Sequence, residues 1–388
     1  MNWVWIVLAY ISIFLFGLSD NLRGPLFADL LREFSLSNSR GSLFFSLSSF
    51  VSMAGAFAAP RIIAKWGHLT SLWIFMLFMS LSFIGYALSP SFEWILFCAV
   101  FFGVSVGGLG VTQNLLVLQG SDQKHRGRAQ GGLHSTYGLS SLIAPGVVIL
   151  IAFLGFGWRI NFYVPAVLSL LTVFAILFMS RKAAAAPSLE EHEESARAKE
   201  SLGFPEVYWA ILLCAYVALE LMVSTRVTLL LREAFAFDLA AANLWTSIFF
   251  VGLFVGRFAY TVKPLPLKLS HQLALSMFLG AGMMALGLLH RPEWISLSGF
   301  ALSIFYPVWM TTLAKVFPDS FQRVASLGIA LTGVSVVFMH TVIGGLTDLV
   351  GLVPAYAAVP ILSFVCGMMV VGFKPLFRER LGDARMPS

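Results

Sequence analysis

Charged residues are scarce in this sequence. Only 11% of its 388 residues are charged, 58% are hydrophobic, and the mean hydropathy is +0.85. Soluble globular domains carry about a quarter of their residues as charged ones. A chain with so few charges cannot cover a globular surface with polar groups, which excludes an ordinary soluble fold.

Cysteine pairs and nucleotide-binding motifs are absent as well. Each of the three cysteines, Cys98, Cys214 and Cys366, lies inside an apolar run without C-x-x-C spacing, so neither a disulfide framework nor a metal site is indicated. No G-x-x-x-x-G-K-[ST] loop is present, which argues against ATP-driven transport. Since the acids and histidines show no catalytic spacing, we expect no enzyme and no cofactor, only a proton or sodium gradient.

The net charge of +6 is spread along the chain. Its basic residues fall between apolar runs and form no single patch, so we expect no nucleic-acid partner and interpret them as determinants of membrane topology.

Twelve apolar segments reach or exceed the ~20 residues that cross a bilayer as a helix. The first lacks the basic start and cleavage site of a signal peptide, so we take it as a membrane helix. The sequence therefore predicts an all-α membrane protein with 12 transmembrane helices in two pseudo-symmetric six-helix bundles. The segments are 4–32, 40–63, 69–89, 92–119, 127–153, 157–180, 205–232, 239–262, 266–289, 292–316, 322–349 and 352–374.

A charged stretch divides the chain. We predict an N-terminal six-helix bundle over 1–180, a cytoplasmic linker over 181–204, and a C-terminal six-helix bundle with a short cytoplasmic tail over 205–388. With both termini in the cytoplasm, 18 of the 25 Lys and Arg residues, Arg257 among them, fall on the cytoplasmic side. This bias predicts a multi-pass protein of a bacterial cytoplasmic (inner) membrane.

The two halves share a short sequence repeat. The string Leu-Leu-Arg-Glu at 30–33 recurs at 230–233, and the same offset of 200 places Asp20 on Glu220. Two related halves are implied, as in many transporters. A chance recurrence of so short a string is the alternative.

Asp20 and Glu220 are the leading functional candidates. An ionised carboxylate in mid-bilayer costs a few kcal/mol, so such residues usually face a cavity. A partly buried acid changes protonation when its surroundings change, which is the minimum requirement for proton coupling. His134 and His340 could relay protons near neutral pH, or be hydrogen-bonded packing residues.

Two arginines accompany these acids. Arg23 follows Asp20 by three residues and can pair with it on one helix face, either as a static ion pair or as a pair that opens during transport. Arg226 follows Glu220 by six residues and either lines the mouth of a cavity or extends to the membrane interface.

Further polar and aromatic residues interrupt the apolar segments. We expect them to contact a polar solute, although hydrogen bonds between helices and lipid packing are open alternatives. Prolines and one acid are candidates for bending or gating. The expected solute-binding residues are Asn21, Arg23, Gln113, Asn114, Tyr137, Arg226, Tyr306 and Trp309, and the gating or structural ones are Lys65, Gly67, Arg128, Pro145, Pro307 and Asp348.

Two six-helix halves, a charged middle linker and a basic loop after the second segment together resemble the major facilitator superfamily. In that loop, residues 60–68, Lys65 and Gly67 match the family motif, whereas Ala64 stands where an Asp is expected. The strings at 17–21, 113–114 and 303–307 look similar to fucose–proton symporters. This resemblance implies that Asp20 is the proton-coupled acid, and Gly110 replaces the second acid of that branch.

The sequence thus predicts a monomeric secondary transporter whose partners are a small polar, sugar-like solute, a coupling ion and the lipid bilayer. It would work by proton-coupled alternating access. Three alternatives remain: an organic-anion or sugar-phosphate transporter that uses Arg23 and Arg226, a multidrug exporter favoured by the 36 Phe residues, and a membrane sensor that transports nothing.

Overall fold

The computed structural model describes residues 1–180 and 202–373, so most of the predicted linker lies outside the described residues. Within these ranges the chain is helical and contains no strand. Twelve helices or helix pairs are long and apolar enough to cross a membrane, which confirms the predicted spans. The N-terminal helices are α1 (Trp3–Leu22), α2 (Phe27–Glu33), α3 (Asn38–Trp66), α4 (His68–Ala87), α5 (Phe92–Gly120), α6 (Arg126–Phe153) and α7 (Ile160–Ser180). The C-terminal helices are α8 (Phe204–Glu233), α9 (Leu239–Val262), α10 (Leu269–Leu289), α11 (Glu293–Leu302), α12 (Phe305–Val316), α13 (Phe321–Val350), α14 (Leu352–Tyr356) and α15 (Ala358–Gly372).

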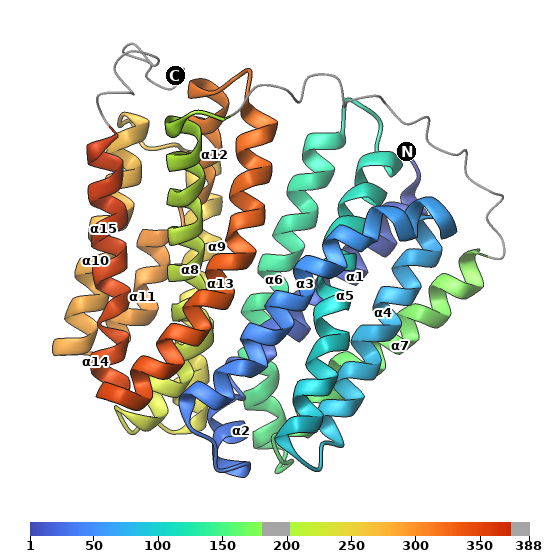
Figure 1. The fold of residues 1–388 in the computed structure, drawn as a ribbon, viewed down its shortest axis with the longest axis horizontal. Helices are drawn as coiled ribbons and strands as arrows, with labels where there is room; N and C mark the ends of the chain where they lie inside the picture. The colour runs from blue at the N-terminus through green and yellow to red at the C-terminus, as the bar shows by residue number, and fades with distance from the viewer. Residues whose placement is uncertain (181–201, 374–388) are drawn as a thin grey trace.

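The helices form two groups that lie side by side (Figure 1). Buried side chains of α1–α7, joined by Leu229 of α8, build one apolar core, and those of α8–α15 build a second. Lipid is as apolar as leucine, so helices in a membrane associate mainly through close packing of small residues. Gly107 of α5 illustrates this, because a Cβ added to it would lie 2.0 Å from the Ser52 carbonyl oxygen of α3. The large apolar side chains left exposed, such as Phe57 and Phe153, suit a hydrocarbon surrounding.

Three of the predicted segments are not single helices, and the prediction of unbroken runs was wrong there. The first breaks between α1 and α2, at Gly24-Pro25, because proline removes a backbone donor and disfavours helix before it. Gly24 also packs closely on the Thr225 backbone of α8. The tenth breaks at Ser303-Ile304, four residues before Pro307, and the twelfth breaks at Ala357, between two prolines.

The two membrane faces differ in their contacts. We call the face at which α1 begins and α15 ends the terminal face, and the face at which α3 begins and α13 ends the opposite face (Figure 1). Polar contacts between the two halves gather toward the opposite face, where α3 crosses α13 (Figure 1). Gly344 of α13 lies so close to α3 that a Cβ there would meet Ser42 Oγ at 2.2 Å. The halves are therefore joined near the opposite face.

Candidate functional site

Asp20 lies near the end of α1 and contacts two groups of its own half. Its Oδ1 accepts a hydrogen bond from Arg23 Nη2 in an ion pair, and its Oδ2 accepts one from the Tyr137 hydroxyl of α6 at 3.0 Å. Asn21 also connects α1 with α6, because its amide donates a hydrogen bond to Ser141 Oγ at 2.9 Å. The carboxylate is 24% exposed, so protons and solvent can reach it.

Arg23 is held from three sides and is nearly buried. Its guanidinium carbon lies 4.5 Å from the Phe102 ring centre, and the rings of Phe44 and Phe45 lie slightly further away. Its Nη1 donates to Ser48 Oγ at 2.8 Å. Contacts of a desolvated guanidinium with aromatic rings contribute about 2 kcal/mol, so these rings help to hold Arg23 in the described conformation.

Glu220 forms the corresponding acid site in the second half. Arg257 of α9 donates from Nη2 to both carboxylate oxygens, at 3.1 and 3.0 Å, and to the Tyr216 hydroxyl at 3.3 Å. Glu220 is 22% exposed and Arg257 is 39% exposed. The second site therefore takes its cation from a neighbouring helix and leaves that cation partly open to solvent.

The break between α11 and α12 supplies acceptors to this site. Pro307 has no N–H for the Ser303 carbonyl four residues earlier, and that oxygen accepts a hydrogen bond from Arg257 Nε at 3.3 Å. The adjacent Leu302 carbonyl accepts one from the Tyr216 hydroxyl at 3.2 Å. A broken membrane helix whose backbone groups face polar side chains is a common way to build a transporter site.

Sequence reasoning missed Arg257. It was counted among the basic residues of the cytoplasmic side, yet it lies inside the α9 span and pairs with Glu220. A signal was present, since Arg257 is a single charge within the apolar run 247–262, and such charges usually face the interior of a bundle.

Arg226 and His340 lie toward the opposite face, between the halves. Arg226 of α8 donates from Nη2 to Ser42 Oγ of α3 at 2.7 Å, and its guanidinium carbon lies 4.3 Å from the Phe27 ring centre. The His340 ring of α13 stacks on Phe45 of α3 at 4.7 Å. Both are buried and contact α3 of the other half, so in this conformation they form part of the interface between the halves.

The predicted amide residues of α5 lie within the first half. Asn114 is half-buried and its Nδ2 donates to the Gly110 carbonyl at 2.6 Å. Gln130 of α6 donates to the Asn114 carbonyl oxygen at 2.9 Å. Gln113 is fully buried, and neither amide atom has a hydrogen-bond partner among the described residues. Because a Cβ on Gly110 would meet nothing within 4 Å, Asn114 is the amide with open space beside it.

The two aromatic residues of α12 have different surroundings. Tyr306 is 38% exposed and precedes Pro307 at the helix break beside Glu220. Trp309 is fully buried, stacks on Trp209 at 6.0 Å and donates from Nε1 to the Trp209 carbonyl at 3.1 Å. Its position leaves no surface for a solute, so we do not include Trp309 in the proposed site.

The remaining predicted residues lie apart from the acids. His134 is exposed, three residues before Tyr137 on α6. Lys65 lies over the Trp66 ring at 5.3 Å, and Gly67 adopts a φ of 79°, which lets the chain turn from α3 into α4. Arg128 is exposed in the first turn of α6, whereas Pro145 lies well inside the same helix.

Asp348 contributes to a set of contacts that joins the halves at the opposite face. Its two oxygens accept hydrogen bonds from the backbone N–H groups of Asn38 and Ser39, both at 2.8 Å, and so cap α3 from the other half. Each of the two repeated Leu-Leu-Arg-Glu strings forms an ion pair with the other half. Arg32 contacts Glu233 at 2.6 Å, and Arg232 contacts Asp29 through two hydrogen bonds of 2.9 and 3.0 Å.

Glu33 secures the loop before α7. It accepts hydrogen bonds from Trp158 Nε1 at 2.7 Å and from Arg159 Nη2 at 2.7 Å. The hydrogen bond from Trp158 has the largest effect and that from Arg159 the next, and both hold the pKa of the Glu33 carboxyl below its ordinary value. The contact lies within the first half and does not join the two groups of helices.

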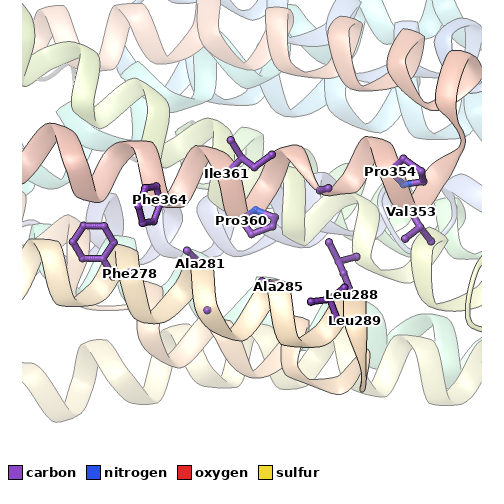
Figure 2. Close-up of a pocket in the computed structure, with 12 residues that line it drawn as sticks. Phe278, Ala281, Ala285, Leu288, Leu289, Val353, Pro354, Pro360, Ile361 and Phe364 are labelled. Carbon is purple, nitrogen blue, oxygen red and sulfur yellow. The ribbon is translucent and has the colours of Figure 1, made fainter.

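A surface groove between α10 and the pair α14–α15 is lined entirely by apolar residues (Figure 2). Phe278 and Phe364 lie at one end of it, with Leu289 and Pro354 at the other. Such a lining suits hydrocarbon and offers nothing to a polar solute. Within residues 1–180 and 202–373, no cluster of His, Cys, Asp and Glu could hold a metal ion.

Comparisons with known proteins agree with this architecture. The family model described as the Major Facilitator Superfamily matches residues 9–297, whereas curated protein sequences gave no significant match. The fold is similar to a bacterial homologue of the human lysosomal transporter Spinster in an inward-facing and occupied conformation, with a TM-score of 0.76 and 13% identity over 98% of both chains. It is also similar to the peptide transporter POT in complex with sulfate, with a TM-score of 0.76 and 12% identity over 97% of this chain and 96% of that one. The inward-open xylose transporter of E. coli gives a TM-score of 0.75 and 14% identity over 96% of both chains.

Proposed function

Because the chain belongs to the Major Facilitator Superfamily, we propose that it is a secondary transporter that moves a small polar, sugar-like solute by proton-coupled alternating access. The observation that carries the proposal is the pair of membrane-embedded acids, one in each half. Each is partly exposed and held by an arginine. Groups of this kind are costly in a bilayer and mark ion pathways.

The contacts between the halves support a simple cycle. In the described conformation α3 and α13 join near the opposite face, so the site would open toward the terminal face. Counting Lys and Arg residues supports placing that face in the cytoplasm. We infer that the protein rocks between this conformation and one in which the contacts of Asp348 and Arg232 are broken.

Asp20 is the proposed proton carrier. When its carboxylate is ionised it accepts from Arg23 and Tyr137. Protonation would neutralise the acid and leave the buried Arg23 guanidinium without its counter-charge, which is unfavourable in a low-dielectric surrounding. Proton binding would thereby change the relative free energies of the two conformations. Glu220 is the second proposed proton carrier.

A polar solute is favoured by polar side chains on the helices of both halves that surround the acids. Asn21, Tyr137 and Asn114 come from the first half, and Tyr306 and Arg257 from the second. Their hydroxyl, amide and guanidinium groups can exchange hydrogen bonds with the hydroxyls of a solute. The likeness to a xylose transporter agrees with a sugar-like solute. The two joined halves can form the whole pathway, so we propose that a monomer suffices.

The test is solute-induced proton movement. Purified protein is reconstituted into liposomes with a pH-sensitive dye inside, and sugars, sugar acids and amino acids are added one at a time. We expect at least one solute to carry protons inward in the wild type and not in Asp20→Asn. If no compound moves protons, and none accumulates when a pH gradient is imposed, the proposal is wrong.

A further inference from the structure

Arg226 is a buried cation for which the described part of the chain provides no anionic partner. Its side chain is 2% exposed, and its polar contact is a single bond to the neutral hydroxyl of Ser42. The Nε of the same guanidinium has no hydrogen-bond partner among the described residues. The nearby Asp348 carboxylate accepts from the α3 backbone and forms no ion pair with Arg226.

A second guanidinium and an imidazole surround the same aromatic ring. The guanidinium carbons of Arg23 and Arg226 lie 5.2 and 5.6 Å from the Phe45 ring centre, and His340 stacks on that ring. Arg23 Nε and His340 Nδ1 also lack hydrogen-bond partners in residues 1–180 and 202–373. Three buried groups with unused nitrogen atoms therefore lie around the Phe45 ring, from the C-terminal end of α1, from α8 and from α13.

The charges of this cluster do not balance. Asp20 compensates Arg23, but nothing described compensates Arg226, and arginine stays protonated at every physiological pH. Removing such an ion from water costs several kcal/mol, whereas its ring contacts return only about 2 kcal/mol. A small anion would supply the missing charge and would also accept from the unused nitrogen atoms.

We propose that Arg226, together with Arg23, binds an oxyanion group of the transported solute, either a carboxylate or a phosphate ester. The planar guanidinium fork matches the oxygen spacing of both groups. Arg226 belongs to the second half and Arg23 to the first, so an oxyanion held by both would join the halves and favour closure around the solute. The inference rests on the proposed function, because it assigns an acidic group to the solute of that pathway.

Equilibrium binding of simple anions tests this without any gradient or flux. The melting temperature of purified protein is measured with sodium phosphate, with sodium acetate, and with sodium chloride at the same ionic strength. A ligand that binds only the folded state raises the melting temperature as its concentration exceeds Kd. We expect phosphate or acetate to do so in the wild type, with acetate indicating a carboxylate and phosphate an ester.

Arg226→Gln should abolish that response, and Arg291→Gln, which removes an exposed arginine, should keep it. If Arg226→Gln does not yield folded protein, Arg226→Lys replaces it, and we expect an at least tenfold weaker Kd because lysine lacks the fork. An unchanged response in the Arg226 variant, or none in the wild type, overturns the inference. Loss of proton movement with the oxyanion response retained would instead contradict the proposed function alone.

Discussion

The two acids have nearly the same exposure, but the arginines that pair with them are placed differently. Asp20 is 24% exposed and Glu220 is 22% exposed, whereas their arginines are 7% and 39% exposed. Arg23 directly follows the helix that carries its acid and lies against three phenyl rings. Arg257 comes from a neighbouring helix and is tied to the backbone at a helix break.

If the acids carry protons as we propose, the burial of the cation, more than that of the acid, should determine how strongly a proton is coupled to a conformational change. Protonating Asp20 would leave a buried guanidinium uncompensated, which is costly. Protonating Glu220 would leave Arg257 with solvent, the Ser303 carbonyl and the Tyr216 hydroxyl. We therefore expect tight coupling at Asp20 and loose coupling at Glu220.

The largest effect is expected from neutralising the two acids in turn. Asp20→Asn should abolish accumulation driven by a pH gradient while leaving exchange of solute across the membrane. Glu220→Gln should slow transport and keep the coupling, because Arg257 retains its other partners. Uptake and exchange of the solute found in the liposome screen give both readings. Gradient-driven accumulation that survives in Asp20→Asn and disappears in Glu220→Gln would show that Glu220, not Asp20, is the tightly coupled acid.

Removing the two cations should give unequal losses of stability. Arg23→Gln breaks a nearly buried ion pair and three ring contacts, so we expect a loss of about 3 kcal/mol in the free energy of unfolding. Arg257→Gln breaks a partly exposed pair, and we expect a loss of about 1 kcal/mol. Thermal melting in one detergent measures both. Equal losses would mean that the exposure of the arginine does not determine how much each ion pair stabilises the fold.

The contacts at the opposite face extend the same comparison to two ion pairs between the halves. Arg232–Asp29 is bidentate and largely buried, whereas Arg32–Glu233 is exposed. Arg232→Gln should shift the population toward opening by about tenfold, equivalent to about 1.4 kcal/mol. Arg32→Gln, the matched control, should change it less than about twofold, since exposed pairs contribute little.

The opening is measured by labelling Ser46→Cys with a membrane-impermeant maleimide. Ser46 lies between the halves and bonds to Thr341 across them, and the native cysteines that are buried, Cys98, Cys214 and Cys366, should react slowly. Labelling of Arg232→Gln that is no faster than that of the wild type would show that the pair does not hold this face closed.

The sequence predicted what depends on length and hydropathy, and it missed what depends on contacts between helices. Twelve spans followed from bilayer thickness, and the string repeated at 30–33 and 230–233 pointed to two related halves. That each string would pair with the other half, Arg32 with Glu233 and Arg232 with Asp29, depends on how the halves pack. No spacing within one helix contains that information.

The candidate site was predicted unevenly for the same reason. Arg23 could be predicted because it follows Asp20 by only three residues, whereas Arg257 lies 37 residues from Glu220 on another helix. The break at Ser303 was also missed, although Pro307 gave a signal, since proline leaves the carbonyl four residues earlier without its usual donor. Trp309 was predicted to contact the solute because it lies near polar residues in the sequence. That position does not show which way the side chain faces, and it is buried against Trp209.

The smallest expected effect concerns Glu33, a contact within one half that should not affect coupling. Because Trp158 and Arg159 hold its pKa below the ordinary 4.5, its stabilising contribution is fully present above that pH. The contribution is lost as the pH falls through the lowered pKa of the folded protein. The melting temperature of the wild type should therefore exceed that of Glu33→Gln by a constant amount down to about pH 4.5, and the gap should narrow below it. A gap that widens with acid would contradict the assigned direction of the shift, whereas solute-induced proton movement should be equal in the two proteins.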